Sequence, residues 1–384
     1  MDEQRLYLDW NATAPVLPEV RDAMMDILNA VPGNASSVHQ DGQRARAVVE
    51  RARRSVAAAI NAPSQAVILT GGATESNNQV LRDHVETTDD PYVICTAVEH
   101  PSVLEVVDKL DNQGVRTDVW PVDEQGRLDM DWLDDRLDDG ATLISVMWAN
   151  NEMGNIYDIE EIAGRLSDTR ALLHVDATQA LGRVDVDFSG AGVDYLTLSF
   201  HKMGGPKGGG ATVVREGLKV GALYNGGHQE RGRRPGTENV PVIAGIDAAA
   251  RAVSERRSRW TDQLKQKKSA FVQTLREEAD DIELRGDPSN QLPNTVNVAF
   301  EGVDGEDLLM ALDLEGISAS SGSACTAGSL EPSHVILAMG YAEEGARQSV
   351  RFSFGPSTPT EALVDGARQI AEVAERLGLL EADW

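Results

Sequence analysis

The 384-residue sequence contains little cysteine and lacks long apolar runs. Its two cysteines, Cys95 and Cys325, exclude a network of disulfides and most zinc sites, which draw on several cysteines. The most apolar stretch, residues 141–149, is far shorter than the roughly 20 residues of a membrane helix. The first residues are polar and acidic, unlike a secretory signal. We therefore expect a cytoplasmic protein without a membrane segment and without a metal.

Basic residues are also scarce. The sequence has 35 lysines and arginines against 62 aspartates and glutamates, a formal net charge of -27. Direct binding to nucleic acid or to an anionic membrane needs a basic surface, so we exclude both functions. Only seven of the 35 basic residues are lysines. An acidic surface poor in lysine suits concentrated salt, because ions screen its self-repulsion. A salt-adapted source is our hypothesis.

Short apolar runs alternate with amphipathic stretches over the first part of the sequence. We expect strands at residues 66–70, 92–97, 115–122, 142–149, 171–175, 195–200 and 210–214. Helical patterns lie between several of them, for example at 75–85 and 159–166. Continuous apolar strands indicate a sheet covered on both faces, and the alternation with helices indicates a doubly wound, mostly parallel sheet. The predicted class is α/β, in which ligands bind at the carboxyl ends of the strands.

The pattern changes from about residue 241. A long charged helix is predicted at 244–278, and its arginine cluster at 256–259 is interpreted as a solvated face. Strands at 295–300 and 349–354 and a terminal helix at 360–377 follow. We predict a large domain at residues 15–255, and a smaller α+β domain formed by residues 1–14 and 256–384.

Polar residues follow three of the predicted strands where each ends. Residues 70–76 combine a glycine turn with the start of a predicted helix, whose free N–H groups could bind a phosphate. Taken alone, this segment fits an ordinary capped turn better. Asp176 either pairs with a cation, such as a ring nitrogen, or caps the next helix. Lys202 precedes a glycine-rich turn, where a desolvated lysine becomes nucleophilic, whereas lone lysines are usually solvated.

Together these three features match one cofactor. Pyridoxal phosphate requires a phosphate anchor, a partner for its ring nitrogen and an amine for its aldehyde. The 70–76 turn, Asp176 and Lys202 supply them in chain order. Standard nucleotide motifs are missing: no Gly-x-Gly-x-x-Gly opens a helix after the first strand, and residues 204–208 lack the Gly-Lys-Ser/Thr ending of a P-loop.

A small, polar segment surrounds the second cysteine. Residues 318–332 are rich in serine, glycine and alanine, and long loops of this composition are functional or disordered. An exposed free thiol is a liability unless it reacts, so we interpret Cys325 as reactive and its loop as mobile. The alternative is an inert thiol on a surface loop. Cys95 lies within an apolar run and is interpreted as core.

Nine segments, in this order, resemble the cysteine desulfurases of the NifS/IscS kind, within the fold-type-I pyridoxal-phosphate enzymes. They are residues 7–13, 72–78, 99–100, 150–154, 174–179, 199–208, 229–239, 320–326 and 350–353. The resemblance runs nearly end to end, and the order of the nine segments makes it specific. It implies a fold-type-I transferase with a large, mostly parallel, doubly wound sheet domain and a smaller α+β C-terminal domain.

The resemblance implies the following cofactor contacts. Lys202 would bind pyridoxal phosphate covalently and move the substrate α-proton, Asp176 would keep the ring nitrogen protonated, and His100 would stack on the ring and assist proton transfer. The remaining contacts would be Ala73, Thr74, Ser199 and His201 to the phosphate, and Asn151 and Gln179 to the ring and its hydroxyl. Thr237 would reach the phosphate of a partner subunit, which implies a homodimer.

The implied substrate is L-cysteine. Arg351 would bind its carboxylate through a bidentate fork, with Asn11 and Asn151 nearby. The Cys325 thiolate would attack the substrate sulfur, which leaves a persulfide on Cys325 and releases alanine. The persulfide would pass to an iron–sulfur scaffold or a sulfur-carrier protein, for cluster assembly or tRNA thiolation.

Four alternatives stand at this point. Two share the fold: a selenocysteine lyase, and another class V aminotransferase-like enzyme. The third is a thiol hydrolase that pairs Cys325 with His334. The fourth is a non-catalytic binding or regulatory relative, and the presence of both Lys202 and Cys325 argues against it.

One residue departs from the family pattern, because Phe200 stands between Ser199 and His201, where the family has a small residue. A ring there either shifts the phosphate or packs beneath the sheet.

Overall fold

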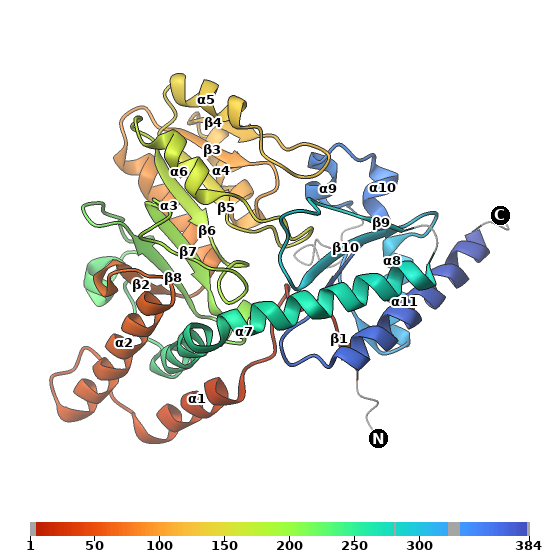
Figure 1. Cartoon of the computed structure of the whole chain (residues 1–384). Helices are drawn as coiled ribbons and strands as arrows, with labels where there is room; N and C mark the ends of the chain where they lie inside the picture. The colour runs from red at the N-terminus through yellow and green to blue at the C-terminus, as the bar shows by residue number, and fades with distance from the viewer. Residues whose placement is uncertain (1–4, 280–281, 322–330, 382–384) are drawn as a thin grey trace.

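The computed structural model describes residues 5–279, 282–321 and 331–381, and a seven-stranded sheet dominates it (Figure 1). The strand order is β2-β8-β7-β6-β5-β3-β4. The strands are β2 (Val67–Thr70), β3 (Tyr92–Thr96), β4 (Arg116–Trp120), β5 (Leu143–Met147), β6 (Leu172–Asp176), β7 (Tyr195–Ser199) and β8 (Gly210–Val214). Neighbours from β4 to β7 run parallel, whereas β8 is antiparallel to both β7 and β2. The predicted α/β class and mostly parallel sheet are confirmed.

Helices cover both faces of this sheet. Tyr92 and Ile94 of β3 belong to one core, and Val93 and Cys95 to the other, which is the alternation of a doubly covered strand. The first face carries α2 (Gln40–Ala59), α5 (Met130–Asp138), α6 (Ile159–Leu166) and the first half of α7 (Val240–Glu278). The second face carries α3 (Ala73–Thr87) and α4 (Pro101–Asp111). Outside these layers, α1 (Pro18–Ala30) packs on α7, and η1 (Ser64–Ala66) leads into β2.

One strand differs from the prediction of uniformly buried strands. Arg116 and Val119 of β4 are exposed at one edge of the sheet, whereas β2 at the opposite edge is buried along its whole length.

A second core lies beside the large sheet. Its antiparallel sheet has the order β12-β10-β9, formed by β9 (Ile282–Leu284), β10 (Thr295–Phe300) and β12 (Ser349–Ser353). The pair β1 (Leu6–Tyr7) and β11 (Ile317–Ser318) joins the N-terminal segment to this second core. The helices of this core are α8 (Gly305–Leu314) and α11 (Thr360–Glu381). Leu264 and Phe271 of α7 contribute to this core as well. The short helices α9 (His334–Ala338) and α10 (Glu343–Arg347) instead bury their apolar residues in the first core.

Helix α7 connects the two cores. Its 39 residues run past both sheets (Figure 1) and extend about 58 Å at 1.5 Å per residue. The predicted boundary between residues 255 and 256 lies within α7, and the division into two domains stays a prediction.

Neither a membrane span nor a metal cluster is found in the described ranges. No helix there has the length and apolarity needed to cross a bilayer. Likewise, the described part of the chain has no group of three or more histidine, cysteine or acidic side chains placed to hold a metal.

Candidate active site

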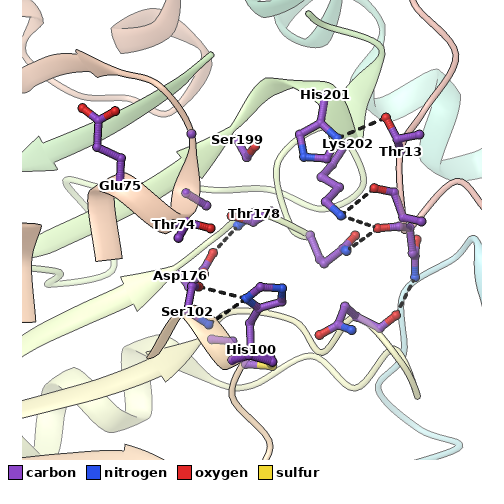
Figure 2. Close-up of a pocket in the computed structure, with 18 of the residues that line it drawn as sticks. Thr13, Thr74, Glu75, His100, Ser102, Asp176, Thr178, Ser199, His201 and Lys202 are labelled. Atoms are coloured by element: carbon purple, nitrogen blue, oxygen red, sulfur yellow. Dashed lines mark hydrogen bonds between the residues drawn. The ribbon is translucent and has the colours of Figure 1, made fainter. Parts of the chain in front are cut away.

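A cavity of about 1060 Å³ opens at the carboxyl ends of the parallel strands, where the sheet topology predicts a ligand. Most of the residues singled out in the sequence line it. They are Asn11, Ala73, Thr74, His100, Asn151, Asp176, Gln179, Ser199, His201, Lys202 and Arg351. Figure 2 shows the side chains of Asp176, His100 and Lys202 around a common space. Because these residues come from distant parts of the chain, the fold alone brings them together.

The start of α3 forms one end of the cavity. Gly72 precedes the helix with φ 154°, no side chain caps the first turn, and a Cβ at this glycine would meet open space. The first N–H groups of a helix lack partners within it and attract anions. The Glu75 carboxylate turns back to the Gly71 N–H at 2.9 Å and to Arg234 at 2.9 Å. The Ala73–Thr74 turn therefore faces the cavity with its backbone donors.

Asp176 ends β6 and is nearly buried, at 5% exposure. Its carboxylate accepts hydrogen bonds from Asn77 Nδ2 at 2.8 Å and from the Thr178 N–H at 2.9 Å. Both donors are neutral, so the carboxylate keeps its negative charge available to a cationic group in the cavity. The interpretation of Asp176 as a helix cap is wrong, because the described residues between β6 and β7 contain no helix, and the bond from the Thr178 N–H belongs to a turn.

His100 has a defined tautomer. Its Nδ1 accepts the backbone N–H of Ser102 at 3.0 Å and lies 2.9 Å from Ser102 Oγ. That hydroxyl already accepts Asn77 Nδ2 at 2.9 Å, so it donates its own hydrogen to Nδ1. Burial lowers the pKa of His100, opposed by the charge of Asp176. The ring is therefore neutral, with its proton on Nε2.

Lys202 lies in the short helix η2 (Phe200–Met203), directly after β7. Its Nζ donates to the carbonyls of Asn11 and Ala12 at 2.6 and 2.8 Å. The Asn11 carbonyl also accepts Gln179 Nε2 at 3.0 Å. The backbone of Asn11 and Ala12 thus orients the side chains of both Lys202 and Gln179.

His201 follows the same strand and contacts Thr13 Oγ1 at 3.1 Å through Nδ1. Burial lowers its pKa to about 4, helped by the nearby positive charges of Lys202, Lys207 and Arg183. At neutral pH the ring is neutral and offers at most one N–H to an anion.

Arg351 lies on β12 and is fully buried, at 1% exposure. It donates to Asp9 Oδ1 at 2.6 Å and to the Asn151 carbonyl at 3.0 Å. Its backbone pairs with that of Ser320. Ser320, five residues before Cys325 in the sequence, is therefore held beside Arg351 through backbone hydrogen bonds.

Comparisons with known proteins agree with this geometry. A family model described as aminotransferase class-V matches residues 6–364. The chain is 41% identical to a cysteine desulfurase of Trichormus azollae, over 99% of this chain and 96% of that protein. It is 39% identical to the cysteine desulfurase NifS of Azotobacter vinelandii, over 99% of this chain and 95% of that one. A solved NifS-like protein matches with a TM-score of 0.90 at 31% identity, over 97% and 100% of the two chains.

The chain belongs to the class-V aminotransferase family. Within it, the relatives at about 40% identity are of the NifS/IscS kind, so the predicted family and fold-type-I architecture are confirmed. Phe200 does not line the cavity; its ring is fully buried in the large core, beneath the sheet. Of the two outcomes expected for this departure, packing beneath the sheet is the one observed.

Pyridoxal phosphate is the cofactor of class-V enzymes and of this chain. The cavity fits it on three observations: the uncapped start of α3, the Asp176 carboxylate with neutral donors only, and the Lys202 amine. In addition, the Thr178 hydroxyl is buried in the cavity and has no partner among the described residues. A phosphate, a cationic ring nitrogen, an aldehyde and a ring hydroxyl would satisfy these groups.

Two predicted site residues are not among those that line the cavity in the described part of the chain. Thr237 is exposed and does not line this cavity. Exposure is compatible with a contact to a partner subunit, and that role stays a prediction. Cys325 falls in residues 322–330, which lie outside the described residues.

Sequence reasoning missed a second layer of polar groups. Asn77 and Ser102 hold Asp176 and His100, but their partners lie up to 99 residues away in the sequence. The buried carboxyls of Glu99 and Glu152 were missed as well, and burial raises the pKa of both. Glu152 accepts from Ser333 Oγ, and the Glu99 carbonyl contacts His334 Nε2 at 2.9 Å. The pair Glu99-His100 stood among the family segments, which was the one signal for Glu99.

Proposed function

We propose that this chain is a cysteine desulfurase that converts L-cysteine to L-alanine and carries the removed sulfur as a persulfide on Cys325. The observation that carries the proposal is the convergence of Lys202, Asp176 and Arg351 on one cavity, with Ser320 bonded beside Arg351. Relatives named cysteine desulfurases, matching over nearly the whole chain, support the same activity.

Each group of residues in the cavity has a separate role in binding or in proton transfer. Pyridoxal phosphate, when bound, supplies the electron sink for the bond changes at the substrate carbons. Asp176 would hold its ring nitrogen, the start of α3 with Ser199 and His201 its phosphate, and Asn151 and Gln179 its ring and hydroxyl. Lys202 moves the α-proton, and the His100 Nε2–H is placed to donate a proton. Asp9 orients the Arg351 guanidinium through an ion pair, and Arg351 binds the substrate carboxylate near Asn11.

The sulfur-transfer step forms one bond and breaks one bond. The Cys325 thiolate attacks the substrate sulfur, so that an S–S bond forms while the substrate C–S bond breaks. The electron pair of the broken bond stays on the substrate carbon, which takes up a proton and becomes the methyl group of alanine. The persulfide then passes to an acceptor.

The decisive experiment combines a spectrum with two cysteine variants. The protein with pyridoxal phosphate should show a visible absorbance band that changes on addition of L-cysteine, and alanine should accumulate with a reductant present. Cys325→Ala should abolish sulfur release but keep the band, whereas the matched Cys95→Ala should keep both. Absence of the band would refute the proposal and leave the thiol hydrolase, and a spectral response to selenocysteine alone would favour the lyase.

We further propose a homodimer in which Thr237 binds the phosphate of the partner subunit. Mixed dimers test this arrangement. Lys202→Ala and Thr237→Ala protomers should each be weak alone, but a mixed dimer contains one site with both residues intact. Recovery of activity on mixing supports shared sites, and no recovery in verified mixed dimers argues against them.

The proposed acceptors are an iron–sulfur scaffold or a sulfur-carrier protein, the latter leading to tRNA thiolation, in the cytoplasm. The acidic charge of the chain supports a protein acceptor rather than RNA itself. Transfer of labelled sulfur from the persulfide enzyme to purified candidates would identify the acceptor, and direct transfer to RNA without a carrier would contradict this part of the proposal.

A further inference from the structure

A second cavity, of about 470 Å³, lies on the other side of Lys202. Helix α7 forms one wall through Arg256, Arg259 and Trp260, and η2 and residues 355–357 form others. The two cores therefore meet at this cavity, along the helix that spans both in Figure 1. Its volume lies within the range of small-molecule sites, roughly 300–1,000 Å³.

The cavity has an unusual charge for this protein. Three arginines line it, Arg183, Arg256 and Arg259, and none of the described residues that line it is acidic. Over the whole sequence, acidic residues outnumber basic ones by 62 to 35. Glu19 binds Arg256 at 2.6 Å from outside the lining, which leaves a positive surplus.

Arg183 makes this surplus significant. Its side chain is 5% exposed, yet its guanidinium donates only to neutral oxygens: Gln179 Oε1, the Gln179 carbonyl and the Lys202 carbonyl. No carboxylate of the described residues forms an ion pair with it. Burial lowers its pKa to about 9, helped by the positive charge of Arg351. A buried charge without a counterion is costly, so an anion in this cavity would stabilise Arg183.

Aromatic rings complete the lining. Trp10 and Trp260 both face the cavity, and Trp10 is only 8% exposed. Gly355 lets the Trp10 ring lie close to the backbone, because a Cβ there would come within 2.2 Å of it. Tryptophan faces beside arginine forks are suited to a planar ring that carries an anion.

We propose that this cavity is a second ligand site, distinct from the active site, for a small aromatic phosphate. The three arginines would bind the phosphate dianion, and the tryptophans would contact the ring. The site adjoins the first cavity, since Lys202 lines both, and Arg183, which lines only the second, donates to the Lys202 carbonyl and to Gln179.

Adenosine monophosphate is a suitable probe, because it combines a planar ring with a phosphate dianion. It would be titrated into the full chain loaded with pyridoxal phosphate, at fixed ionic strength, with tryptophan fluorescence and calorimetry as readouts. Adenosine and ribose 5-phosphate each lack one half of the ligand. We expect both to bind about tenfold more weakly or worse, since each loses one set of contacts.

Two neighbouring arginines provide a matched pair of variants. Arg259 lines the cavity, whereas Arg257 points to Asp185 at 2.6 Å and does not line it. Arg259→Gln should weaken adenosine monophosphate about tenfold, and Arg257→Gln should leave its affinity unchanged. Absence of binding at millimolar probe, equal loss in both variants, or equal affinity for ribose 5-phosphate would each overturn the proposal.

Discussion

Asn77 is the residue on which the charge arrangement of the active site depends. Its amide donates one hydrogen to Asp176 and the other to Ser102, which in turn donates to His100. A single buried side chain thus orients the Asp176 carboxylate and fixes the tautomer of the neighbouring histidine. Asn77 would therefore position both the partner of the cofactor's ring nitrogen and the Nε2 proton of His100.

Replacement of Asn77 should therefore weaken cofactor binding. Asn77→Ala removes a hydrogen bond to a charged group, worth about 2 kcal/mol or roughly thirtyfold in affinity. Asn77→Asp should be more harmful, because it places a second carboxylate beside Asp176. The measurement is the dissociation constant of pyridoxal phosphate from its visible band.

Asn112 provides the control, since it makes the same kind of contact on the surface, to Asp108 Oδ2 at 3.2 Å. Asn112→Ala should leave the constant unchanged. A wild-type constant in Asn77→Ala would show that Asp176 needs no such support.

At the scale of elements, the 3-10 helix η3 (Gln229–Gly232) precedes Thr237 and has a strained backbone. Glu230 and Arg231 have φ of 49° and 59°, a region that non-glycine residues rarely adopt. The Glu230 carboxylate holds this turn by two bonds to the buried Arg53 of α2, at 2.6 and 2.8 Å. Leu69 of β2 also donates to it, at 3.2 Å.

Glu230→Gln should lower the free energy of unfolding by about 3–5 kcal/mol, because it leaves the buried Arg53 charge with only the longer contact to the exposed Glu50, at 3.4 Å. Arg44 lies on α2, like Arg53, and forms an exposed ion pair with Asp41. Arg44→Gln should therefore lower the free energy of unfolding by less than about 1 kcal/mol. Urea unfolding of both variants checks this difference. Equal, small losses of unfolding free energy in both variants would mean that the turn does not depend on the Glu230–Arg53 ion pair.

Helix α7 carries a lysine whose burial produces a pH effect. Lys268 Nζ donates to Gln291 Oε1 and to the Leu292 carbonyl, both at 3.0 Å. Burial lowers its pKa from 10.5 to about 8. Between these values the unfolded chain holds the proton and the folded chain does not, so the folded state gains stability as the pH rises.

Relative to Lys268→Met, the wild type should therefore gain up to about 3 kcal/mol of unfolding free energy between pH 8 and 10.5. Unfolding curves of both proteins across this range measure the gain. Lys265→Met, at an exposed position on the same helix, should show no such change. A pH-independent difference for Lys268→Met would contradict the assignment.

The elements themselves were largely predictable. Helix 159–166 has the predicted bounds, and α3 and α11 extend only a few residues beyond theirs, because periodicity is a local property of the sequence. Local patterns do not show which edge strand leaves side chains exposed, and β4 was therefore misjudged. The site residues followed from motifs at strand ends, whereas the bonds from Asn77 to Asp176 and Ser102, and from Arg183 to the Lys202 carbonyl, join distant parts of the sequence.

For the whole molecule, the net charge of -27 sets the response to salt. Like charges on the surface repel one another, and the screening length falls from about 8 Å at 0.15 M salt to about 3 Å at 1 M. The melting temperature should accordingly rise with potassium chloride at pH 7. Near pH 4.6, the isoelectric point, the same salt series should have a much smaller effect. Full stability in dilute buffer at pH 7 would remove the hypothesis of a salt-adapted protein.

The burial of Cys95 has a practical consequence. Its side chain is fully enclosed in β3, and burial raises the pKa of its thiol. With only two cysteines in the chain, any thiol that the native protein offers to an alkylating reagent belongs to Cys325. One equivalent of a fluorescent maleimide should therefore count working enzyme molecules without any engineered cysteine, and a second equivalent should react only after unfolding.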